Sequence, residues 1–173
     1  MLYIFTGNGK GKTTSAIGQA ARAVGEGKRV LMVQFIKGPW KSGEDDIEIT
    51  GKGEFKLVKM GKGFVGILGD SLPREEHERA SGEALEYAKR ETETKNWDIL
   101  ILDEVNNAIA LNLVSKESVL EFIDWSQDKL EHLILTGRDA APEIIERADL
   151  VTEMKDIKHP YEKGVKGKRG LEY

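Results

Sequence analysis

Residues 7–14 (GNGKGKTT) combine glycines, lysines and threonines in a spacing that suits binding of a phosphate chain. Glycines allow successive backbone N–H groups to turn inward and form a concave anion site. Lys12 supplies a mobile positive charge, Thr13 supplies a hydroxyl suited to Mg²⁺, and Lys10 indicates a highly charged oligophosphate. Thr6 stands where the first glycine of G-x-x-x-x-G-K-T is expected. The candidate phosphate-binding residues are Gly7, Asn8, Gly9, Lys10, Gly11, Lys12, Thr13 and Thr14.

Two acids follow an apolar run in the middle of the chain. Asp103 and Glu104 come directly after residues 99–102 (ILIL). A buried strand that ends in paired acids is typical of the Walker B element, whose first acid holds Mg²⁺ directly or through water. The alternative is a strand that simply emerges into a polar loop. Together with the phosphate-binding loop, the pattern predicts a metal site made by Thr13 and an acid of this pair, and either carboxylate can be the ligand.

Two further cations also follow short apolar runs. Arg138 lies in residues 136–139 (TGRD), where it contacts phosphate or ribose or, alternatively, forms an ion pair within an ordinary turn. Lys37 follows residues 29–36 (RVLMVQFI), and we expect its charge to face the nucleotide. Trp40, close behind Lys37, is either a stacking platform or an anchor of its loop.

The histidines give no metal-binding spacing, and His77 and His132 are expected to be structural or surface residues. His159 lies in a C-terminal tail, about residues 155–173, that carries six basic residues and three acids. On charge alone this segment is a solvated basic tail.

Composition excludes several classes of protein. A length of 173 residues predicts a single domain spanning residues 1–173. The net charge of −4 provides no general attraction to nucleic acid, and the lack of cysteine excludes disulfides and zinc–thiolate sites. No signal peptide is recognisable, and no apolar run approaches the roughly 20 residues that cross a bilayer. We therefore expect a cytoplasmic protein with no nucleic-acid or membrane partner.

The elements that must position these residues alternate between strand and helix. Strands are predicted at residues 2–6, 29–36, 55–60, 98–102, 132–136 and 150–154. Helices are predicted at about 12–24, 73–95 and 142–148 and after Ser115, with a surface loop at 37–53 and a glycine-rich loop at 61–69. This alternation predicts a three-layer α/β fold, a mostly parallel sheet with helices on both faces. Each candidate site residue except Phe64, introduced below, then lies at or just beyond the carboxyl end of a strand, where such sheets bind ligands.

Taken together, these motifs resemble the P-loop type ATP:corrinoid adenosyltransferases over nearly the whole chain. The resemblance rests on residues 5–14, 33–38, 102–104, 136–138, 158–161, 164–166 and 170–173. The loop of this family reads TGNGKGKT, so Thr6 is one of its features. The resemblance implies a P-loop NTPase (RecA-like) fold.

The resemblance also implies the reaction. ATP is the co-substrate with Mg²⁺, and the substrate is a reduced corrinoid, either cob(I)alamin or a precursor such as cob(I)yrinic acid a,c-diamide. Cobalt attacks C5′ of ATP and triphosphate leaves, so that the loop and Lys12 hold the leaving chain. A flavoprotein reductant and a homodimer are implied as well. Because the nucleophile is a metal-centred electron pair, no general base is required.

The glycine-rich loop matches the family only in part. The family has Gly-Phe-Thr-Trp there, with aromatic residues thought to displace the lower axial ligand of the corrinoid. Here the segment is Gly63-Phe64-Val65-Gly66, so Phe64 is the candidate catalytic residue, and Gly66 replaces the tryptophan. The alternative for the apolar residues of this loop is packing within the domain or against a second subunit.

Two other functions remain open at this stage. One is a phosphotransferase or ATPase of thymidine-kinase-like or RecA-like type. The other is a non-catalytic, nucleotide-gated corrinoid-binding module.

Overall fold

The computed structural model describes residues 1–38, 41–67, 69–94, 96–160, 164–165 and 167–171. A six-stranded sheet has the order β3-β2-β4-β5-β1-β6, and all of its pairs are parallel. The strands are β1 (Leu2–Thr6), β2 (Arg29–Gln34), β3 (Glu54–Lys59), β4 (Ile99–Asp103), β5 (His132–Thr136) and β6 (Leu150–Glu153). The six predicted strands are confirmed, with boundaries shifted by at most two residues.

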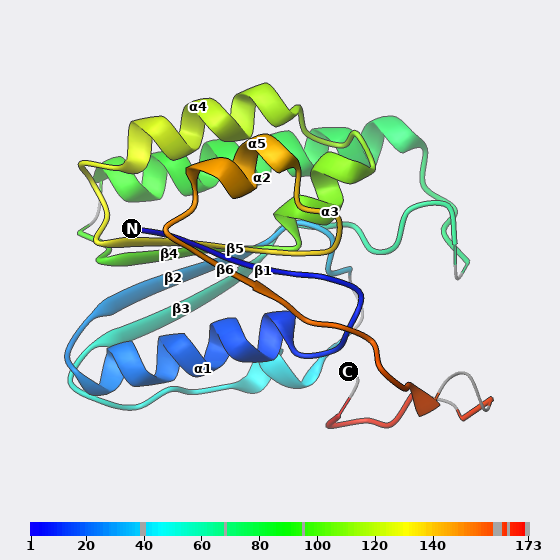
Figure 1. Cartoon of the computed structure of the whole chain (residues 1–173), viewed down its shortest axis with the longest axis horizontal. Helices are drawn as coiled ribbons and strands as arrows, with labels where there is room; N and C mark the ends of the chain where they lie inside the picture. The colour runs from blue at the N-terminus through cyan, green and yellow to red at the C-terminus, as the bar shows by residue number, and fades with distance from the viewer. Residues whose placement is uncertain (39–40, 68, 95, 161–163, 166, 172–173) are drawn as a thin grey trace.

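Helices cover both faces of this sheet, as Figure 1 shows. Helix α1 (Lys12–Gly25) lies on one face. The other face carries α2 (Arg74–Thr94), α3 (Val105–Ala110), α4 (Lys116–Ser126) and α5 (Pro142–Arg147). The predicted three-layer α/β fold is therefore confirmed, whereas α3 is an element that the sequence analysis did not predict.

Two apolar cores follow from the alternation of side chains along the strands. One core joins α1 to one sheet face and includes Ala16, Ala20 and Met32. The larger core joins the opposite face to α2–α5 and includes Leu31 and Phe122. Because both faces are covered, the central strands are apolar nearly throughout, as parallel strands usually are.

The segment predicted as an open surface loop, residues 37–53, contains a short 3-10 helix, η1 (Gly43–Asp46). Ser42 and Asp45 form a capping box at its start. No helix among the described residues is long and apolar enough to span a membrane. All of the β→α connections leave the sheet at one edge, on the right of Figure 1, and this edge carries the candidate site.

Candidate functional site

The phosphate-binding loop joins β1 to α1 and is packed tightly against the segment that follows β6. Gly7 and Gly11 have positive φ values of 94° and 117°, which glycine adopts readily. A Cβ on Gly7 would lie 2.5 Å from the carbonyl oxygen of Met154, and one on Gly9 would lie 2.7 Å from that of Lys155. The Gly9 N–H also donates a hydrogen bond to the Met154 carbonyl over 2.7 Å. The glycines are thus needed for the close approach of the two backbone segments as well as for the turn itself.

Thr6 occupies the position of the first loop glycine without strain, because it is still part of β1. Its carbonyl accepts a hydrogen bond from the Met154 N–H over 2.8 Å. Its hydroxyl accepts one from the Ala140 N–H over 3.3 Å. An extended residue needs no glycine, and the hydroxyl ties the β5–α5 connection to the phosphate-binding loop.

Lys12 is folded into the loop that it follows. Its ammonium group donates hydrogen bonds to the carbonyl oxygens of Gly7 at 2.7 Å and Gly9 at 2.8 Å. Only 8% of Lys12 is exposed, and burial lowers the pKa of its side chain while the charge of Glu104 opposes this shift. An ammonium group has three N–H donors, so one remains for a ligand in addition to the two loop contacts.

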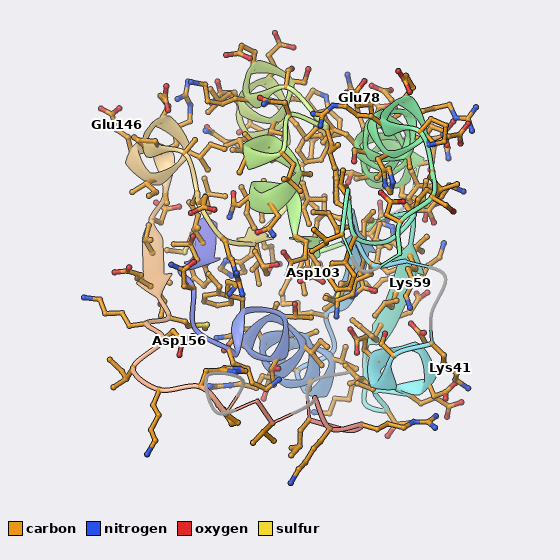
Figure 2. The ribbon with its side chains drawn as sticks, turned by 90° about the vertical axis from the view of Figure 1, so that its right-hand side faces the viewer. Lys41, Lys59, Glu78, Asp103, Glu146 and Asp156 are labelled. Atoms are coloured by element: carbon orange, nitrogen blue, oxygen red, sulfur yellow. The ribbon has the colours of Figure 1, made fainter. Side chains whose placement is uncertain are left out.

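Asp103, the last residue of β4, is fully buried and surrounded by donors. Its carboxylate accepts hydrogen bonds from the hydroxyls of Thr136 at 2.6 Å and Thr13 at 2.9 Å, and from the Gln34 amide at 3.0 Å. Burial raises the pKa of Asp103, and these hydrogen bonds oppose that shift. Figure 2 looks onto the carboxyl edge of the sheet and shows Asp103 near its centre.

Gln34 and Thr136 were not predicted to contact Asp103, although each could have been noticed as a polar residue that ends an apolar strand. Both are completely buried. Neighbouring parallel strands β2, β4 and β5 bring Gln34, Asp103 and Thr136 to one level of the sheet. A polar residue at the end of such a strand needs a hydrogen-bonding partner there.

Glu104 differs from Asp103 in both backbone and surroundings. It has a left-handed φ of 63°, which is uncommon for a residue with a side chain, and its N–H donates to the Thr136 hydroxyl over 2.9 Å. Its side chain lines the main cavity. Burial, reinforced by the neighbouring charge of Asp103, raises the pKa of Glu104 to about 7. A positively charged ligand in the cavity would reverse that effect.

The cavity at this edge has a volume of about 750 Å³, within the usual range for small-molecule sites. The predicted residues that line it are Asn8, Gly9, Lys10, Gly11, Lys12, Thr13, Thr14, Lys37, Glu104 and Arg138. Gly7 and Asp103 are outside this lining but accept hydrogen bonds from Lys12 and Thr13, which belong to it. Four described residues of the C-terminal tail also line the cavity, Asp156, His159, Gly170 and Leu171. Phe64 is not among the described residues of this lining.

Lys37 enters the cavity together with an acid that the sequence analysis missed. Its ammonium group lies 2.5 Å from the Glu44 carboxylate of η1, and both residues line the cavity. Burial lowers the pKa of Lys37, but the hydrogen bond and charge of Glu44 outweigh it, so that the net shift is upward. The run Glu44-Asp45-Asp46 after the capping residue Ser42 was the available sign of a helical turn.

Two more lysines hold η1 in place. Asp45 pairs with Lys59 of β3 and Asp46 pairs with Lys41, each at 2.7 Å. Figure 2 shows Lys41 and Lys59 beside this turn. The Lys41 pair is well exposed, whereas Lys59 and Asp45 are 18% and 23% exposed at their side chains. The turn that carries Glu44 is therefore attached to β3 through a partly buried ion pair.

Arg138 lies in the β5–α5 connection and also lines the cavity. Gly137 before it has a φ of 127°, and a Cβ there would lie 2.8 Å from the Asn107 backbone nitrogen. The Arg138 N–H donates to the Asn107 side chain at the same place. The described residues contain no ion-pair partner for the Arg138 side chain. Of the two predicted alternatives, this arrangement favours a guanidinium group that is available to an anion. Because α3, which carries Asn107, was not predicted, this support was missed.

Phe64 lies at the same edge of the sheet in the connection between β3 and α2. It is 48% exposed, and Ile67 is 57% exposed, whereas Val65 packs against the larger core. The predicted alternative of packing within the domain therefore holds for Val65. Leu68, and Trp40 with its two predicted roles, lie outside the described residues. The described residues also contain no group of three or more acids, histidines or cysteines placed to hold a metal.

Comparisons with known proteins identify the family. The model of the family described as ATP:corrinoid adenosyltransferase BtuR/CobO/CobP matches residues 1–173. A protein named corrinoid adenosyltransferase from Escherichia coli K12 is 38% identical over 173 residues, which are all of this chain and 85% of the relative. Similar proteins from Salmonella typhimurium and Pseudomonas aeruginosa are 36% and 35% identical, again over the whole chain and over 85% and 83% of the relatives.

Proposed function

The chain belongs to the ATP:corrinoid adenosyltransferase family, and from this premise we propose that it transfers the 5′-deoxyadenosyl group of ATP to the cobalt of a reduced corrinoid. The electron pair of cobalt(I) attacks C5′ and a Co–C bond forms. The C5′–O5′ bond breaks, its electron pair goes to the oxygen, and triphosphate leaves. The observation that carries the proposal is the cavity of nucleotide size that Lys12, Lys37 and Arg138 line together in a chain of this family.

In this proposal the phosphate-binding loop binds the leaving group, triphosphate. The N-terminus of α1 and the loop N–H groups bind triphosphate oxygens, and the third donor of Lys12 adds a charged contact. Lys10, Lys37 and Arg138 face the same cavity. Negative charge on the triphosphate increases as the C5′–O5′ bond breaks, so cations fixed in advance lower the barrier.

Mg²⁺ fits the oxygen donors at this edge. The Thr13 hydroxyl donates its hydrogen bond to Asp103, so the lone pairs of the Thr13 oxygen remain available to a cation. Both oxygens of Asp103 already accept hydrogen bonds, whereas Glu104 lines the cavity. We assign Thr13 and Glu104 as direct ligands and Asp103 as the residue that orients Thr13. Bound Mg²⁺ would neutralise triphosphate charge, and its remaining positions suit phosphate and water oxygens.

The corrinoid is assigned to the outer side of the same edge. It is much larger than a nucleotide, and the exposed side chains of Phe64 and Ile67 offer it an apolar surface close to the carboxyl ends of β2 and β3. A reduced flavoprotein is the proposed electron donor, and a homodimer is the proposed assembly. ATP as a substrate agrees with a cytoplasmic reaction.

The test is an anaerobic incubation of the protein with ATP, Mg²⁺ and chemically reduced cob(I)alamin. We expect a light-sensitive Co–C product and one triphosphate per adenosyl group transferred. Formation of ADP and phosphate would favour the phosphotransferase or ATPase alternative. Saturable corrinoid binding without any Co–C bond would favour the non-catalytic module.

A further inference from the structure

The connection between β3 and α2, of which residues 61–67 and 69–73 are described, exposes the side chains of Phe64 and Ile67 and yet is held at both ends. We refer to it as the Phe64 loop. At its first end, the N–H groups of Gly61 and Gly63 donate to the carbonyl oxygens of Gln34 and Ile36 over 3.1 and 2.9 Å. These contacts continue the β2–β3 ladder and fix the chain just before Phe64. They leave the second half of the loop to be fixed by something else.

A single carboxylate organises that second half. Asp70 accepts hydrogen bonds from the backbone N–H groups of Gly66 at 2.8 Å and Leu72 at 3.1 Å. Gly66 and Gly69 have positive φ values of 70° and 81°, so the chain reverses sharply enough for both donors to reach one side chain. Hydrogen bonds from neutral donors to an ionised carboxylate are among the stronger ones in proteins. They hold the pKa of Asp70 below its usual range.

The same carboxylate is attached to the body of the protein through His77. The Nε2 atom of His77 lies 3.2 Å from the Asp70 carboxylate, and the two side chains are only 2% and 8% exposed. His77 belongs to the first turns of α2, whose residues Ala80 and Ala84 are buried. The position of Asp70 is thus set by a helix that is part of the core. Asp70 in turn sets the path of the chain on the far side of Phe64 and Ile67.

This arrangement is more elaborate than a connection between β3 and α2 requires. Phe64 and Ile67 are 48% and 57% exposed, and exposed apolar side chains on a mobile loop tend to collapse onto other apolar groups. An inward-facing carboxylate with a buried histidine partner keeps the loop ordered while its apolar residues stay at the surface. Such an arrangement is expected where an ordered apolar surface has to meet a ligand.

We propose that Asp70, fixed by His77, is a positioning residue for the corrinoid, which holds Phe64 and Ile67 in the place where they meet the lower face of the substrate. This inference rests on the proposed function. Asp70 itself touches neither the corrinoid nor ATP. Its loss is expected to impair the step that depends on the lower axial ligand and to leave binding of ATP intact.

The test compares three corrinoids with the wild type and four variants. The substrates are pre-reduced cob(I)alamin, cob(II)alamin with a reduced flavin, and cob(II)inamide with the same flavin, since cobinamide lacks the lower nucleotide ligand. The variants are Asp70→Ala, Asp70→Asn, His77→Gln and the control Asp98→Ala. Asp98 accepts a backbone hydrogen bond from Arg29 at 2.7 Å at the opposite edge of the sheet, so its loss is similar in kind but remote from the loop.

For Asp70→Ala we expect kcat/KM with cob(II)alamin to fall by about tenfold or more, because two charge-assisted hydrogen bonds are lost. The loss with cob(II)inamide and with cob(I)alamin should be much smaller, and KM for ATP should not change. Asp70→Asn and His77→Gln, which keep a polar group in place, should retain part of the activity. In the EPR spectrum of bound cob(II)alamin, Asp70→Ala should keep the splitting from the axial nitrogen in a larger fraction of molecules than the wild type.

Equal losses for all three corrinoids, or a pattern matched by Asp98→Ala, would overturn the role of Asp70 and leave the proposed function standing. A wild-type protein that forms no Co–C bond even with pre-reduced cob(I)alamin would overturn the proposed function itself. Should Asp70→Ala fail to fold, Asp70→Asn and His77→Gln decide the question through the same ratios of kcat/KM.

Discussion

The phosphate-binding loop and the Phe64 loop lie at the same edge of one sheet but are held in place by different means. The first is packed against its neighbours so closely that Gly7 and Gly9 leave no room for a Cβ. Lys12, which follows this loop, is only 8% exposed. In the Phe64 loop, Gly66 would find open space around a Cβ, and Phe64 is half exposed.

This difference shows which of the two loops allows little change of its residues and which allows more. The contacts of the phosphate-binding loop run backbone to backbone, so a change at one residue displaces several others. The second half of the Phe64 loop depends on the side-chain contacts of Asp70. Under the proposed function, residues of the Phe64 loop such as Gly66 can therefore differ from those of relatives, while the residues proposed to bind triphosphate stay the same.

The largest effect on activity is expected for Lys12→Ala, next to the tightly packed phosphate-binding loop. A charge-assisted contact is worth roughly 1.5–3 kcal/mol, so kcat/KM with ATP and pre-reduced cob(I)alamin should fall by about 10- to 150-fold. The control is Lys10→Ala, since Lys10 is an exposed residue of the same loop and should cost much less. Turnover within twofold of the wild type for Lys12→Ala would remove Lys12 from the mechanism.

Gly9→Ala tests the rigidity of the phosphate-binding loop directly. The new Cβ would lie 2.7 Å from the Lys155 carbonyl oxygen and 2.8 Å from that of Met154, so backbone must move. We expect the free energy of unfolding, measured by denaturant titration, to fall by about 1–3 kcal/mol, and ATP binding to weaken. Gly18→Ala is the matched control, because nothing lies within 4 Å of its Cβ inside α1. It should stabilise the protein by about 0.5–1 kcal/mol. A harmless Gly9→Ala would show that the loop is looser than its contacts indicate.

The same difference explains how much could be predicted from the sequence. Strands buried on both faces, and glycines forced by close contacts, leave a local pattern that does not depend on distant residues. The six strands and the cavity-lining residues of the phosphate-binding loop were predicted for that reason. The network around Asp103 joins Thr13, Gln34 and Thr136, which are far apart in the chain, so only the strand order reveals it.

Other features were missed because tertiary contacts stabilise weak local patterns. Helix α3 has only six residues and begins at Val105, directly after Glu104. The left-handed backbone of Glu104 could not be predicted, because such a conformation is usually marked by a glycine. The turn η1 looked like a polar surface loop, since its acids are stabilised by lysines elsewhere, among them Lys59 of β3. Likewise, the sequence does not show that Asp70 meets His77.

Phe64→Ala tests the Phe64 loop, which is the less tightly packed of the two loops. An aromatic contact contributes about 0.5–1.5 kcal/mol beyond its buried area, which corresponds to a loss of roughly two- to tenfold. We expect that loss in conversion from cob(II)alamin, with a smaller one from pre-reduced cob(I)alamin. The thermal unfolding temperature should hardly change, because Phe64 is already 48% exposed in the folded protein. Equal losses with both substrates would mean that Phe64 only packs.

The smallest effect is expected for Glu44→Gln, and the informative result is whether KM for ATP falls or rises. Lys37 and Glu44 are 30% and 12% exposed at their side chains, so this ion pair is partly screened by solvent. If triphosphate competes with Glu44 for Lys37, removal of the acid frees the cation, and KM for ATP should fall by about two- to threefold. Inhibition by added triphosphate should strengthen by a similar factor.

The control for this variant is Asp46→Asn on the same turn, because its pair with Lys41 is well exposed and lies outside the cavity lining. It should leave KM for ATP and inhibition by triphosphate unchanged. A rise in KM for Glu44→Gln would instead mean that Glu44 holds Lys37 in the orientation that ATP requires. The contacts of Lys37 would then be as fixed as those of the phosphate-binding loop. A fall in KM would place one adjustable contact beside the rigid loop, because η1 could move as its acid exchanges with the triphosphate.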